Sequence, residues 1–512
     1  EVAYGAAIAG ARALASMKHV GVNVALDPIM SSAYTGVNGG LVLVSADDPG
    51  MWSSQNEQDN RWIGLHARLP IFEPYNPQSA RDYTKLAFEF SERFKHPVMV
   101  RTVTRVSHTW GIVETCAPSR PKFGSGFFRE PRRYALVPAN ARERKRDLVK
   151  RWEEIKRAVE ELPHGQWGEG DVLVITTGVG YAYVVEALGN LGQRARVLQI
   201  VTPVPPPRRL ILDTATAAEK ILVVEEGDGV VEMQVRALLQ ESGLRTVVYG
   251  KEYLAEWGEL TLEIVEGALA KVLGVPRRRV EHIKPSLEAP PRPPFFCAGC
   301  PHMGSFYAAK LATSLSRVKP VYSGDIGCYS MAVSPPYGQQ DLLTDMGSSI
   351  GLGMGIYRGT NGREFIVAVI GDSTFFHAGL PALANAVYTN TPMLVLVLDN
   401  RYTAMTGGQP NPTQSIDIAE VSKALGADFV TVADPFDLEK AKEEVRRAIS
   451  VVKEGGVAVV VMQRACTLEA LRELGLSGPP FYVDLSACRA CGLCYNVVAC
   501  PALMPLPDGK VV

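Results

Sequence analysis

IGDSTFFHAGLPALANAVYTNTPMLVLVLDN, residues 370–400, is the stretch of this sequence that decides the fold. An apolar run ends in Gly-Asp-Ser, a helical stretch follows, and a second apolar run ends in Asp-Asn. This order predicts a strand, a helix and a second strand parallel to the first. Because parallel strands end at the same edge of a sheet, we expect Asp372 and Asn400 to face one another across a crevice there.

The residue types at these two strand ends predict a site for a metal and a diphosphate. Asp372 and Asn400 offer the oxygen ligands that Mg²⁺ prefers, and phosphate oxygens and water usually complete its coordination. Gly371 would let the backbone approach a diphosphate, while Ser373 and Thr374 offer hydroxyl and N–H donors. A lone aspartate after a strand is common in α/β proteins, so the prediction depends on finding both motifs around one strand–helix–strand unit.

The composition is that of an ordinary globular chain. The 512 residues allow three or four domains at ~150 residues each. With 53 basic and 54 acidic residues the net charge is −1, which gives no charge pattern for binding nucleic acid or an anionic membrane. No apolar stretch approaches the ~20 residues of a membrane span, and no leader is visible, so we expect a cytoplasmic protein. The chain begins at Glu1 without a methionine, and we expect it to be a segment of a longer product.

Further along the chain, composition predicts the other structural elements. We expect an alanine- and glycine-rich helix over 1–15, a buried strand over 40–50 followed by a polar loop, and a charged linking helix over 141–162. Three β-rich runs, 171–180, 196–207 and 221–230, predict a second α/β unit. KPSLEAPPRPPFF (284–296) is a proline-rich linker. A third unit follows, with expected strands near 319–323, 365–370, 393–398 and 456–463.

Single and paired cysteines surround the third unit. Cys297 and Cys300 form a C-x2-C pair at its start, Cys328 follows an expected strand, and Cys466 follows another. Four thiolates can hold a tetrahedral zinc or a 4Fe–4S cluster. A structural zinc site usually shows two C-x2-C pairs, whereas two of these cysteines are dispersed, but the spacing alone leaves both possibilities open.

The tail CRACGLCYNVVACP (488–501) has the C-x2-C-x2-C spacing of an iron–sulfur run, closed by a cysteine before a proline. No second run of this kind follows. The sequence therefore predicts half of a ferredoxin-like segment, with the cysteines Cys488, Cys491, Cys494 and Cys500.

Several longer segments carry a family resemblance. CAGCPHMGSF, GDIGCYS, DMGSSIGLGMG, GDSTFFHAG and LDNRYTAMTGGQP together resemble the thiamine domain of 2-oxoacid:ferredoxin oxidoreductases. The resemblance is closest to the large (α) subunits of the branch that acts on indolepyruvate. It extends over essentially the whole chain, including SADDPGMWSSQNEQDNR in the first region. The Gly-Asp-Ser and Asp-Asn motifs are similar to the GDG and NN motifs of thiamine-dependent enzymes, with Ser373 and Asp399 as departures that remove no metal ligand.

This resemblance implies an α/β fold with doubly wound thiamine-diphosphate-binding domains. A Pyr-type domain that is incomplete at its N-terminus would occupy 1–150, and a transketolase C-terminal-like domain 165–283. A PP-type domain would occupy 295–480, and a partial ferredoxin-like 4Fe–4S segment 484–512.

The resemblance also assigns cofactor ligands. Asp372, Asn400 and the backbone carbonyl of Tyr402 would bind Mg²⁺. The thiamine diphosphate would lie against Gly371, Asp372, Ser373, Thr374, Asn400, Tyr402, Gly327, Met346 and Gly347. A proximal 4Fe–4S cluster would be held by Cys297, Cys300, Cys328 and Cys466.

Five residues are candidates for catalysis. Glu1 stands where relatives have the glutamate that activates the aminopyrimidine ring of thiamine, although a glutamate at a helix start is also favoured by the helix dipole. His19, His302 and His377 lie in or beside matched segments and could move protons, although a lone histidine is more often structural. Lys18 could pair with the carboxylate of the substrate.

The activity implied is the oxidative decarboxylation of arylpyruvates, including indolepyruvate, to acyl-CoA and CO₂ through a thiamine carbanion and enamine. Ferredoxin would accept the electrons, and a smaller β subunit would complete a hetero-oligomer. The alternatives are another 2-oxoacid:ferredoxin oxidoreductase, or a non-oxidative thiamine-dependent decarboxylase or lyase with a structural metal. A third is an electron-transfer or scaffolding subunit with a vestigial thiamine site.

In the family, the tail is the first half of a two-cluster ferredoxin domain. Cys488, Cys491 and Cys494 would then share a cluster with a cysteine that this chain lacks. The spacing from Cys494 to Cys500 exceeds the usual three intervening residues. We expect the tail to be disordered or to lack a cluster, although Cys500 could fold back as a fourth ligand.

Overall fold

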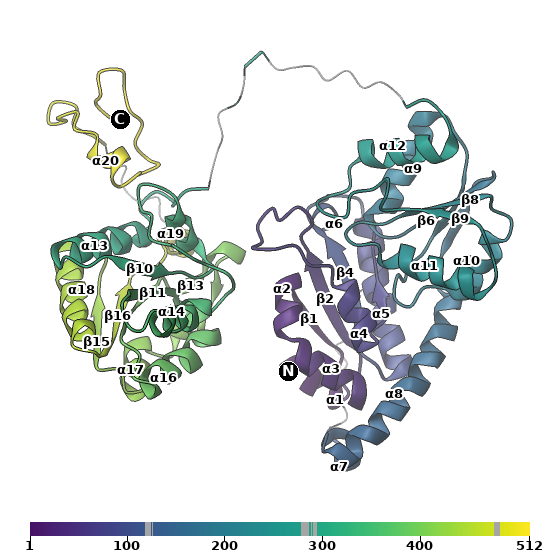
Figure 1. The fold of residues 1–512 in the computed structure, drawn as a ribbon, viewed down its shortest axis with the longest axis horizontal. Helices are drawn as coiled ribbons and strands as arrows, with labels where there is room; N and C mark the ends of the chain where they lie inside the picture. Colours follow the sequence, from purple (N-terminus) through teal and green to yellow (C-terminus); the bar gives the residue numbers. More distant parts are fainter. Residues whose placement is uncertain (118–123, 125, 278–285, 288, 290–293, 476–481) are drawn as a thin grey trace. The chain divides into compact units, whose positions relative to one another are not determined.

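The structure is a computed structural model that describes residues 1–117, 124, 126–277, 286–287, 289, 294–475 and 482–512. The chain divides into two compact units, Glu1–Lys284 and Pro285–Val512, and each is described by itself (Figure 1). Most of the linker predicted over 284–296 lies outside the described residues. Within the described ranges, no helix is both long and apolar enough to cross a membrane.

The first unit begins with a parallel four-stranded sheet in the order β1-β2-β4-β3. Its strands are β1 (Ala13–Lys18), β2 (Leu41–Asp47), β3 (Ile71–Phe72) and β4 (Val98–Val103). The helices in this region are α1 (Val2–Ile8), α2 (His19–Val24), α3 (Leu26–Thr35), α4 (Arg61–Ala67), α5 (Pro77–Phe94), α6 (Thr104–Ser107) and α7 (Pro131–Tyr134). The buried strand expected over 40–50 is confirmed as β2.

The helix expected over 1–15 is wrong beyond Ile8. Gly10 adopts a positive φ of 93°, which ends the helical stretch, and the chain continues as β1. Alanine and serine have little intrinsic preference for strands, but the six residues of β1 pair in parallel register with β2, from Ala13 opposite Leu41 to Lys18 opposite Ala46. Pairing with a neighbouring strand therefore overrides the local helical preference.

The charged helix predicted over 141–162 is confirmed as α8 (Pro138–Ala158), followed by the short 3₁₀ helix η1 (Val159–Glu161). Leu148, Trp152 and Ile155 recur at a spacing of three or four residues and are buried in the core of the first sheet. Apolar residues at this spacing form one face of a helix, and charged residues cover the rest of α8.

A second sheet in the first unit has the order β5-β7-β6-β8-β9 and is parallel except for β5, which is antiparallel to β7. Its strands are β5 (Gly165–Trp167), β6 (Val172–Thr176), β7 (Arg196–Gln199), β8 (Lys220–Val224) and β9 (Val247–Tyr249). Its helices are α9 (Val179–Leu191), α10 (Arg208–Ala215), α11 (Val230–Glu241) and α12 (Leu262–Leu273). Two separate apolar clusters cover its two faces, so it is doubly wound.

Buried ion pairs join the two sheets of the first unit. Arg61 is fully buried and bonds Asp59 at 2.5 Å and Glu225 of the second sheet at 2.6 Å. Arg101, also buried, bonds Asp47 at 2.5 Å and Glu73 at 2.6 Å. The two guanidinium groups thus compensate four carboxylates at one place in the core.

The second unit contains a five-stranded parallel sheet in the order β10-β11-β12-β16-β15. Its strands are β10 (Pro320–Ser323), β11 (Phe365–Gly371), β12 (Met393–Asp399), β15 (Phe429–Ala433) and β16 (Val457–Gln463). One face packs against α13 (Pro301–Leu315) and α18 (Leu438–Lys453), and the other against α14 (Ser348–Gly359), α16 (Leu380–Tyr388) and α17 (Ile418–Ala424) (Figure 1). Four strands are confirmed where the sequence predicted them, and β15 is an additional one.

The cysteine tail has a defined backbone in residues 482–512. It contains the short helix α20 (Leu493–Asn496) and a turn closed by a bridge between Pro505 and Val511. The Leu506 amide donates to the Lys510 carbonyl at 2.7 Å within this turn, and the Cys500 amide donates separately to the Cys494 carbonyl at 3.1 Å. The expectation that the tail is disordered or lacks a cluster stays a prediction.

Candidate active site

The two predicted strand ends lie at one edge of the second unit's sheet. Gly371 is the last residue of β11 and pairs with Leu398 of β12, so Asp372 lies next to the strand end formed by Asp399 and Asn400. Asp372, Asp399 and Asn400 are all buried. The parallel strand–helix–strand unit predicted from residues 370–400 is confirmed.

The Asp372 carboxyl is short of positive charge among the described residues. Its pKa is raised to about 7, mainly by burial and also by the neighbouring Asp399 carboxyl, although the Asn411 amide lowers it by donating a 2.9 Å hydrogen bond to Oδ2. The Ser373 amide donates to Oδ1 at 2.7 Å. Two buried carboxyls this close repel one another unless a proton or a cation joins them. This donor set fits a hard cation such as Mg²⁺.

The chain after β12 returns to Asp372 through a short hairpin. β13 (Tyr402–Thr403) pairs antiparallel with β14 (Gln409–Pro410), and Asn411 follows directly. The Asn400 side-chain oxygen accepts a hydrogen bond from the Tyr402 amide at 3.1 Å. Asp372, Asn400 and Tyr402 thus belong to two adjacent strand ends and the hairpin between them, and their role as Mg²⁺ ligands remains a prediction.

Two of the predicted cofactor-contact positions, Gly327 and Gly371, have no room for a side chain because the ring of Tyr329 packs against both. A Cβ on Gly327 would lie 2.3 Å from Cε1 of Tyr329, and a Cβ on Gly371 would lie 2.4 Å from the same atom. Tyr329 is buried and bonds the Ile326 carbonyl at 2.9 Å. Because both positions are glycine, the Tyr329 ring can pack between the two loops. The sequence motif alone did not reveal this reason for the two glycines.

Asp325 is a site residue that sequence reasoning missed. It is fully buried, and both of its carboxylate oxygens accept a hydrogen bond from the Gly347 amide at 2.9 Å. Burial raises its pKa to about 7, although several backbone N–H groups lower it. Gly347 has a φ of 99°, a conformation that favours glycine, and the adjacent Met346 is 42% exposed. Asp325 therefore fixes the loop that carries Met346 and Gly347, two of the predicted cofactor contacts.

The remaining predicted contacts, Ser373 and Thr374, form the short helical turn α15 (Asp372–Thr374) after β11. Thr374 is buried, whereas Ser373 is half-buried and its hydroxyl accepts a 3.2 Å hydrogen bond from the hydroxyl of Thr403. The hairpin after β12 is thus also bonded to the turn after β11.

The structure brings the four cysteines of the proximal set near one another. Burial raises the pKa of the Cys300 thiol to about 12, and Cys328, Cys297 and Cys466 each add to the shift. The pKa of Cys328 rises to about 11, again through burial and then through Cys466 and Cys297. Four thiols close enough to affect the pKa of Cys300 and Cys328 form a donor set suited to a positively charged metal group.

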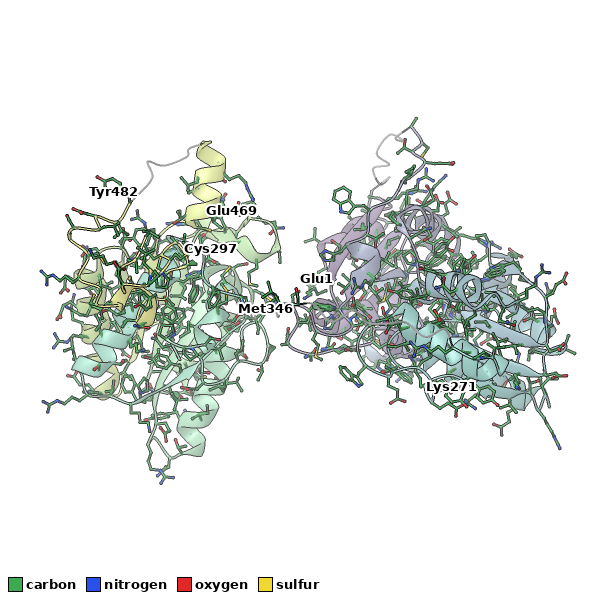
Figure 2. All side chains as sticks on the ribbon, turned by 90° about the horizontal axis from the view of Figure 1, so that it is seen from above. Glu1, Lys271, Cys297, Met346, Glu469 and Tyr482 are labelled. Carbon is green, nitrogen blue, oxygen red and sulfur yellow. The ribbon has the colours of Figure 1, made fainter. Side chains whose placement is uncertain are left out.

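Backbone bonds fix the cysteine set beside the strand edge. The Cys466 amide donates to the Asn400 carbonyl at 2.9 Å, and Thr467 bonds the carbonyl of Gly299, between Cys297 and Cys300, at 2.7 Å. In Figure 2, Cys297 lies beside α19 (Thr467–Leu474), the helix that carries Glu469. Among the described residues, no three His, Cys, Asp or Glu side chains are arranged to hold a single metal ion.

The predicted histidines differ in environment. His302 is buried between the rings of Phe296 and Tyr329, and burial lowers its pKa to about 4, so it is neutral at physiological pH. Its Nε2 lies 3.4 Å from the Asn400 side-chain nitrogen. His377 is exposed on the π-helix η3 (Phe375–Gly379).

Glu1, Lys18 and His19 belong to the first unit. Glu1 is exposed at the N-cap position of α1 and its side chain makes no capping hydrogen bond, so both its catalytic role and the helix-dipole alternative stay open. Lys18 bonds the Ser53 carbonyl at 2.7 Å, and Nε2 of the buried His19 lies 3.0 Å from the Asn56 carbonyl. Segment 53–60, which belongs to the stretch that carried the family resemblance, is thus in contact with both residues.

The chain is similar in sequence to known thiamine-dependent proteins. The thiamine pyrophosphate enzyme C-terminal TPP binding domain matches residues 325–462. The indolepyruvate oxidoreductase subunit IorA of Thermococcus kodakarensis is 41% identical, with 100% of this chain and 84% of that protein covered, and IorA of Archaeoglobus fulgidus gives the same figures. Among solved structures, a 2-oxoglutarate:ferredoxin oxidoreductase from Magnetococcus marinus is 15% identical, with a TM-score of 0.40 over 53% of this chain and 55% of that one.

Proposed function

Since the chain belongs to the family of indolepyruvate oxidoreductase IorA subunits, we propose that it oxidatively decarboxylates arylpyruvates such as indolepyruvate, with coenzyme A as acyl acceptor and ferredoxin as electron acceptor. The chain is an oxidoreductase that acts on 2-oxoacids. The balanced half-reaction is R–CO–COO⁻ + CoA–SH → R–CO–S–CoA + CO₂ + H⁺ + 2 e⁻.

One observation carries the proposal: the cysteine set and the metal–diphosphate motif meet at the same sheet edge. Cys466 is bonded through its amide to the carbonyl of Asn400, and the thiol of Cys328 interacts electrostatically with Asp372. A non-oxidative thiamine enzyme needs no redox group at this place. The four cysteines beside the metal–diphosphate motif therefore support the proposal that this enzyme removes electrons from its substrate.

Three groups of this chain would hold thiamine diphosphate and its metal. Asp372, Asn400 and the Tyr402 carbonyl would bind Mg²⁺, and Asn411 would orient Asp372 through its 2.9 Å hydrogen bond. Thiamine diphosphate, when bound, supplies the electron sink for loss of CO₂. Glu1 would activate the cofactor's ring, and the neutral His302 could accept a proton beside Asn400.

The cysteines would hold iron–sulfur clusters. Cys297, Cys300, Cys328 and Cys466 would bind a proximal 4Fe–4S cluster, and the tail cysteines would belong to a second one. A zinc site on the same four thiols is the alternative, and it would leave the enzyme without a route for electrons.

The expected partners follow from the same family assignment. We expect a smaller β subunit and ferredoxin as protein partners, in a cytoplasmic hetero-oligomer. Regions 1–150 and 295–480 would be the two thiamine-binding domains of the subunit. Region 165–283 would be its transketolase C-terminal-like domain, and region 484–512 its partial ferredoxin-like segment.

The decisive measurement is anaerobic, 2-oxoacid-dependent dye reduction by the full-length subunit with its partner. Indolepyruvate, phenylpyruvate and pyruvate are compared with and without CoA, and iron and acid-labile sulfide are measured on the same sample. We expect activity that needs CoA and is highest with an arylpyruvate. Colourless, zinc-loaded protein that decarboxylates without reducing the dye would reject the proposal.

A pair of cysteine variants controls the assay. Cys300→Ser should lose the iron and sulfide of the proximal cluster together with dye reduction, because it removes a thiol from the buried set. Cys116→Ser should retain all three, because Cys116 is exposed and lies in the first unit. Equal behaviour of the two variants would argue against a proximal cluster on this set.

A further inference from the structure

The lengthened spacing in the cysteine tail contains a contact with the body of the second unit. Five residues, 495–499, separate Cys494 from Cys500, where an iron–sulfur run of this kind usually has three. Val498 lies within this longer stretch, and its carbonyl accepts a 2.6 Å hydrogen bond from the hydroxyl of Tyr337. The longer spacing thus places the Val498 carbonyl within hydrogen-bonding distance of the Tyr337 hydroxyl.

The Tyr337 ring is held by the segment that leads into the proximal cysteines. It is only 7% exposed, and it packs edge-on against Phe296 with ring centres 5.1 Å apart. Phe296 directly precedes Cys297 in the chain. Phe306 of α13 lies 6.1 Å from the same ring. Edge-to-face aromatic pairs are worth about 0.5–1.5 kcal/mol each beyond the area they bury, so the ring has a defined position.

Cysteines from both sets lie around this tyrosine. Cys300 of the proximal set, together with Val498 and Cys500 of the tail, packs against the buried cluster that contains Phe296 and Tyr337. Burial raises the pKa of Tyr337 to about 12, and the Cys300 and Cys500 thiols both add to that shift. Tyr337 is therefore a point at which the two cysteine sets approach one another.

The aromatic contacts continue to the cofactor motif. Phe296 lies 6.4 Å from the His302 ring, and His302 lies 5.9 Å from Tyr329, which packs against Gly371. A continuous row of rings thus connects the end of β11 to the residue that binds the tail. This row gives the docking contact a fixed position relative to the candidate active site.

We propose that Tyr337 is a positioning residue for electron transfer, whose hydroxyl docks the tail beside the Cys297–Cys300 turn so that the tail cysteines receive electrons from this side. The inference rests on the proposed function. Each 2-oxoacid that is oxidised releases two electrons, and two oxidised ferredoxin molecules take up one each. Tyr337 itself is neither oxidised nor a metal ligand; it sets the distance across which single electrons pass.

The test uses the full-length subunit with its partner and the variant Tyr337→Phe, which keeps the ring and removes only the hydroxyl. Tyr322→Phe is the matched control, because Tyr322 is equally buried in the same cluster and its hydroxyl lies 3.4 Å from Thr313 of α13, away from the tail. Amide hydrogen exchange of residues 493–500 reports docking without any need for cofactor. Stopped-flow absorbance and the spin coupling between reduced clusters report electron transfer.

We expect Tyr337→Phe to speed exchange over residues 493–500 by about 3- to 10-fold, the effect of one lost hydrogen bond. Its iron content and first reduction phase should match the wild type, while the second phase slows and the spin coupling weakens. Tyr322→Phe should change none of these. Unchanged exchange in Tyr337→Phe, or faster exchange with an unchanged second phase, would overturn the inference. Loss of all 2-oxoacid-dependent reduction in the wild type would instead reject the proposed function, and the exchange result would still test the docking contact.

Discussion

Two buried groups of charged side chains in this protein differ in how their charge is compensated. In the first unit, Arg61 and Arg101 lie among carboxylates from two sheets. Burial alone would raise the pKa of Asp59, but Arg101 and Arg61 outweigh it and hold that pKa well below its usual value. In the second unit, Asp372 is buried beside another carboxyl, and its pKa rises to about 7.

The difference separates a structural ion network from a binding site. In the first group, Asp47, Asp59 and Glu73 each have a guanidinium group beside them, although burial still raises the pKa of Glu225. At the ends of β11 and β12, Asp399 has Arg401 3.5 Å away, whereas Asp372 lowers its energy when a proton or a cation arrives. The same holds for the Cys300 and Cys328 thiols beside them, whose pKa values are raised by burial and by neighbouring cysteines. Each variant proposed below changes one charged or hydrogen-bonding side chain in one of the two units.

The largest effect is expected from Asp372→Asn. The variant removes the negative charge that would face Mg²⁺, and removing one partner of a buried charge pair costs about 3–5 kcal/mol. Affinity for thiamine diphosphate in the presence of Mg²⁺ should fall by roughly 100- to 5000-fold, measured by isothermal titration calorimetry. Asp417→Asn is the control, because Asp417 is an exposed N-cap of α17 and asparagine caps helices equally well. Equal affinities of the two variants would contradict the assignment.

A large effect on stability is expected from Arg101→Met in the first unit. The change leaves Asp47 buried without its guanidinium partner and leaves Glu73 with only the longer 3.8 Å contact to Arg61, and breaking such a buried pair costs about 3–5 kcal/mol. Urea unfolding of the first unit's transition should show this loss. Arg93→Met, in an exposed pair with Glu161 at 3.4 Å, should change stability by less than about 1 kcal/mol. A similar small loss in both variants would mean that the buried network contributes little.

The sequence predicted much of the fold because apolar runs and charge periodicity are local signals. β11, β12 and the amphipathic α8 follow directly from their residues. β1 could not be predicted in this way, because its alanine-rich sequence forms a strand only through pairing with β2. β15, over Phe429–Ala433, is a five-residue strand at the edge of the sheet that was likewise missed.

The candidate site was predictable where its residues follow a strand within one motif, as Asp372 and Asn400 do. Asp325, Tyr329 and Asn411 were missed because their roles arise from contacts between distant segments. Asn411 reaches Asp372 only after the hairpin folds back, over a separation of 39 residues. The meeting of the four cysteines came from family resemblance, since spacing alone left zinc and iron–sulfur equally open.

A pH dependence of opposite sign is expected in the two units. Asp325 has a folded-state pKa of about 7 against an ordinary value of 3.8, so the folded protein holds a proton between these pH values that the unfolded chain has lost. Its contribution to the stability of the cofactor-free protein should therefore fall as pH rises from about 4 to 7, by at most about 1.4 kcal/mol per pH unit.

Asp48 in the first unit behaves in the opposite way. Burial would raise its pKa, but hydrogen bonds from Ser54 and Ser53 lower it to about 2, so its contribution is present above about pH 4 and is lost as pH falls toward 2. Urea midpoints measured from pH 4.5 to 7.5 should show a slope that Asp325→Asn reduces and Asp48→Asn leaves unchanged. A slope in Asp325→Asn equal to that of the wild type would show that Asp325 is ionised in the folded protein.

The smallest effect is expected from Tyr402→Phe, which tests whether this residue serves the cation through its backbone. Its hydroxyl donates a 2.6 Å hydrogen bond to Glu473 of α19, and that bond is the main cause of a pKa raised to about 12. The predicted Mg²⁺ ligand is instead the carbonyl, which the substitution leaves in place. The affinity for Mg²⁺ and thiamine diphosphate should stay within about threefold of the wild type, while lost bonding to α19 costs about 1–2 kcal/mol in urea unfolding. Asn400→Ala, one strand end away, should lose affinity on the scale of Asp372→Asn. If Tyr402→Phe lost affinity to that extent, the Tyr402 hydroxyl rather than the backbone carbonyl would be the group that contributes to cofactor binding. The cation would then be bound by side chains alone, just as the charges of the first unit's ion pairs are compensated by side chains alone.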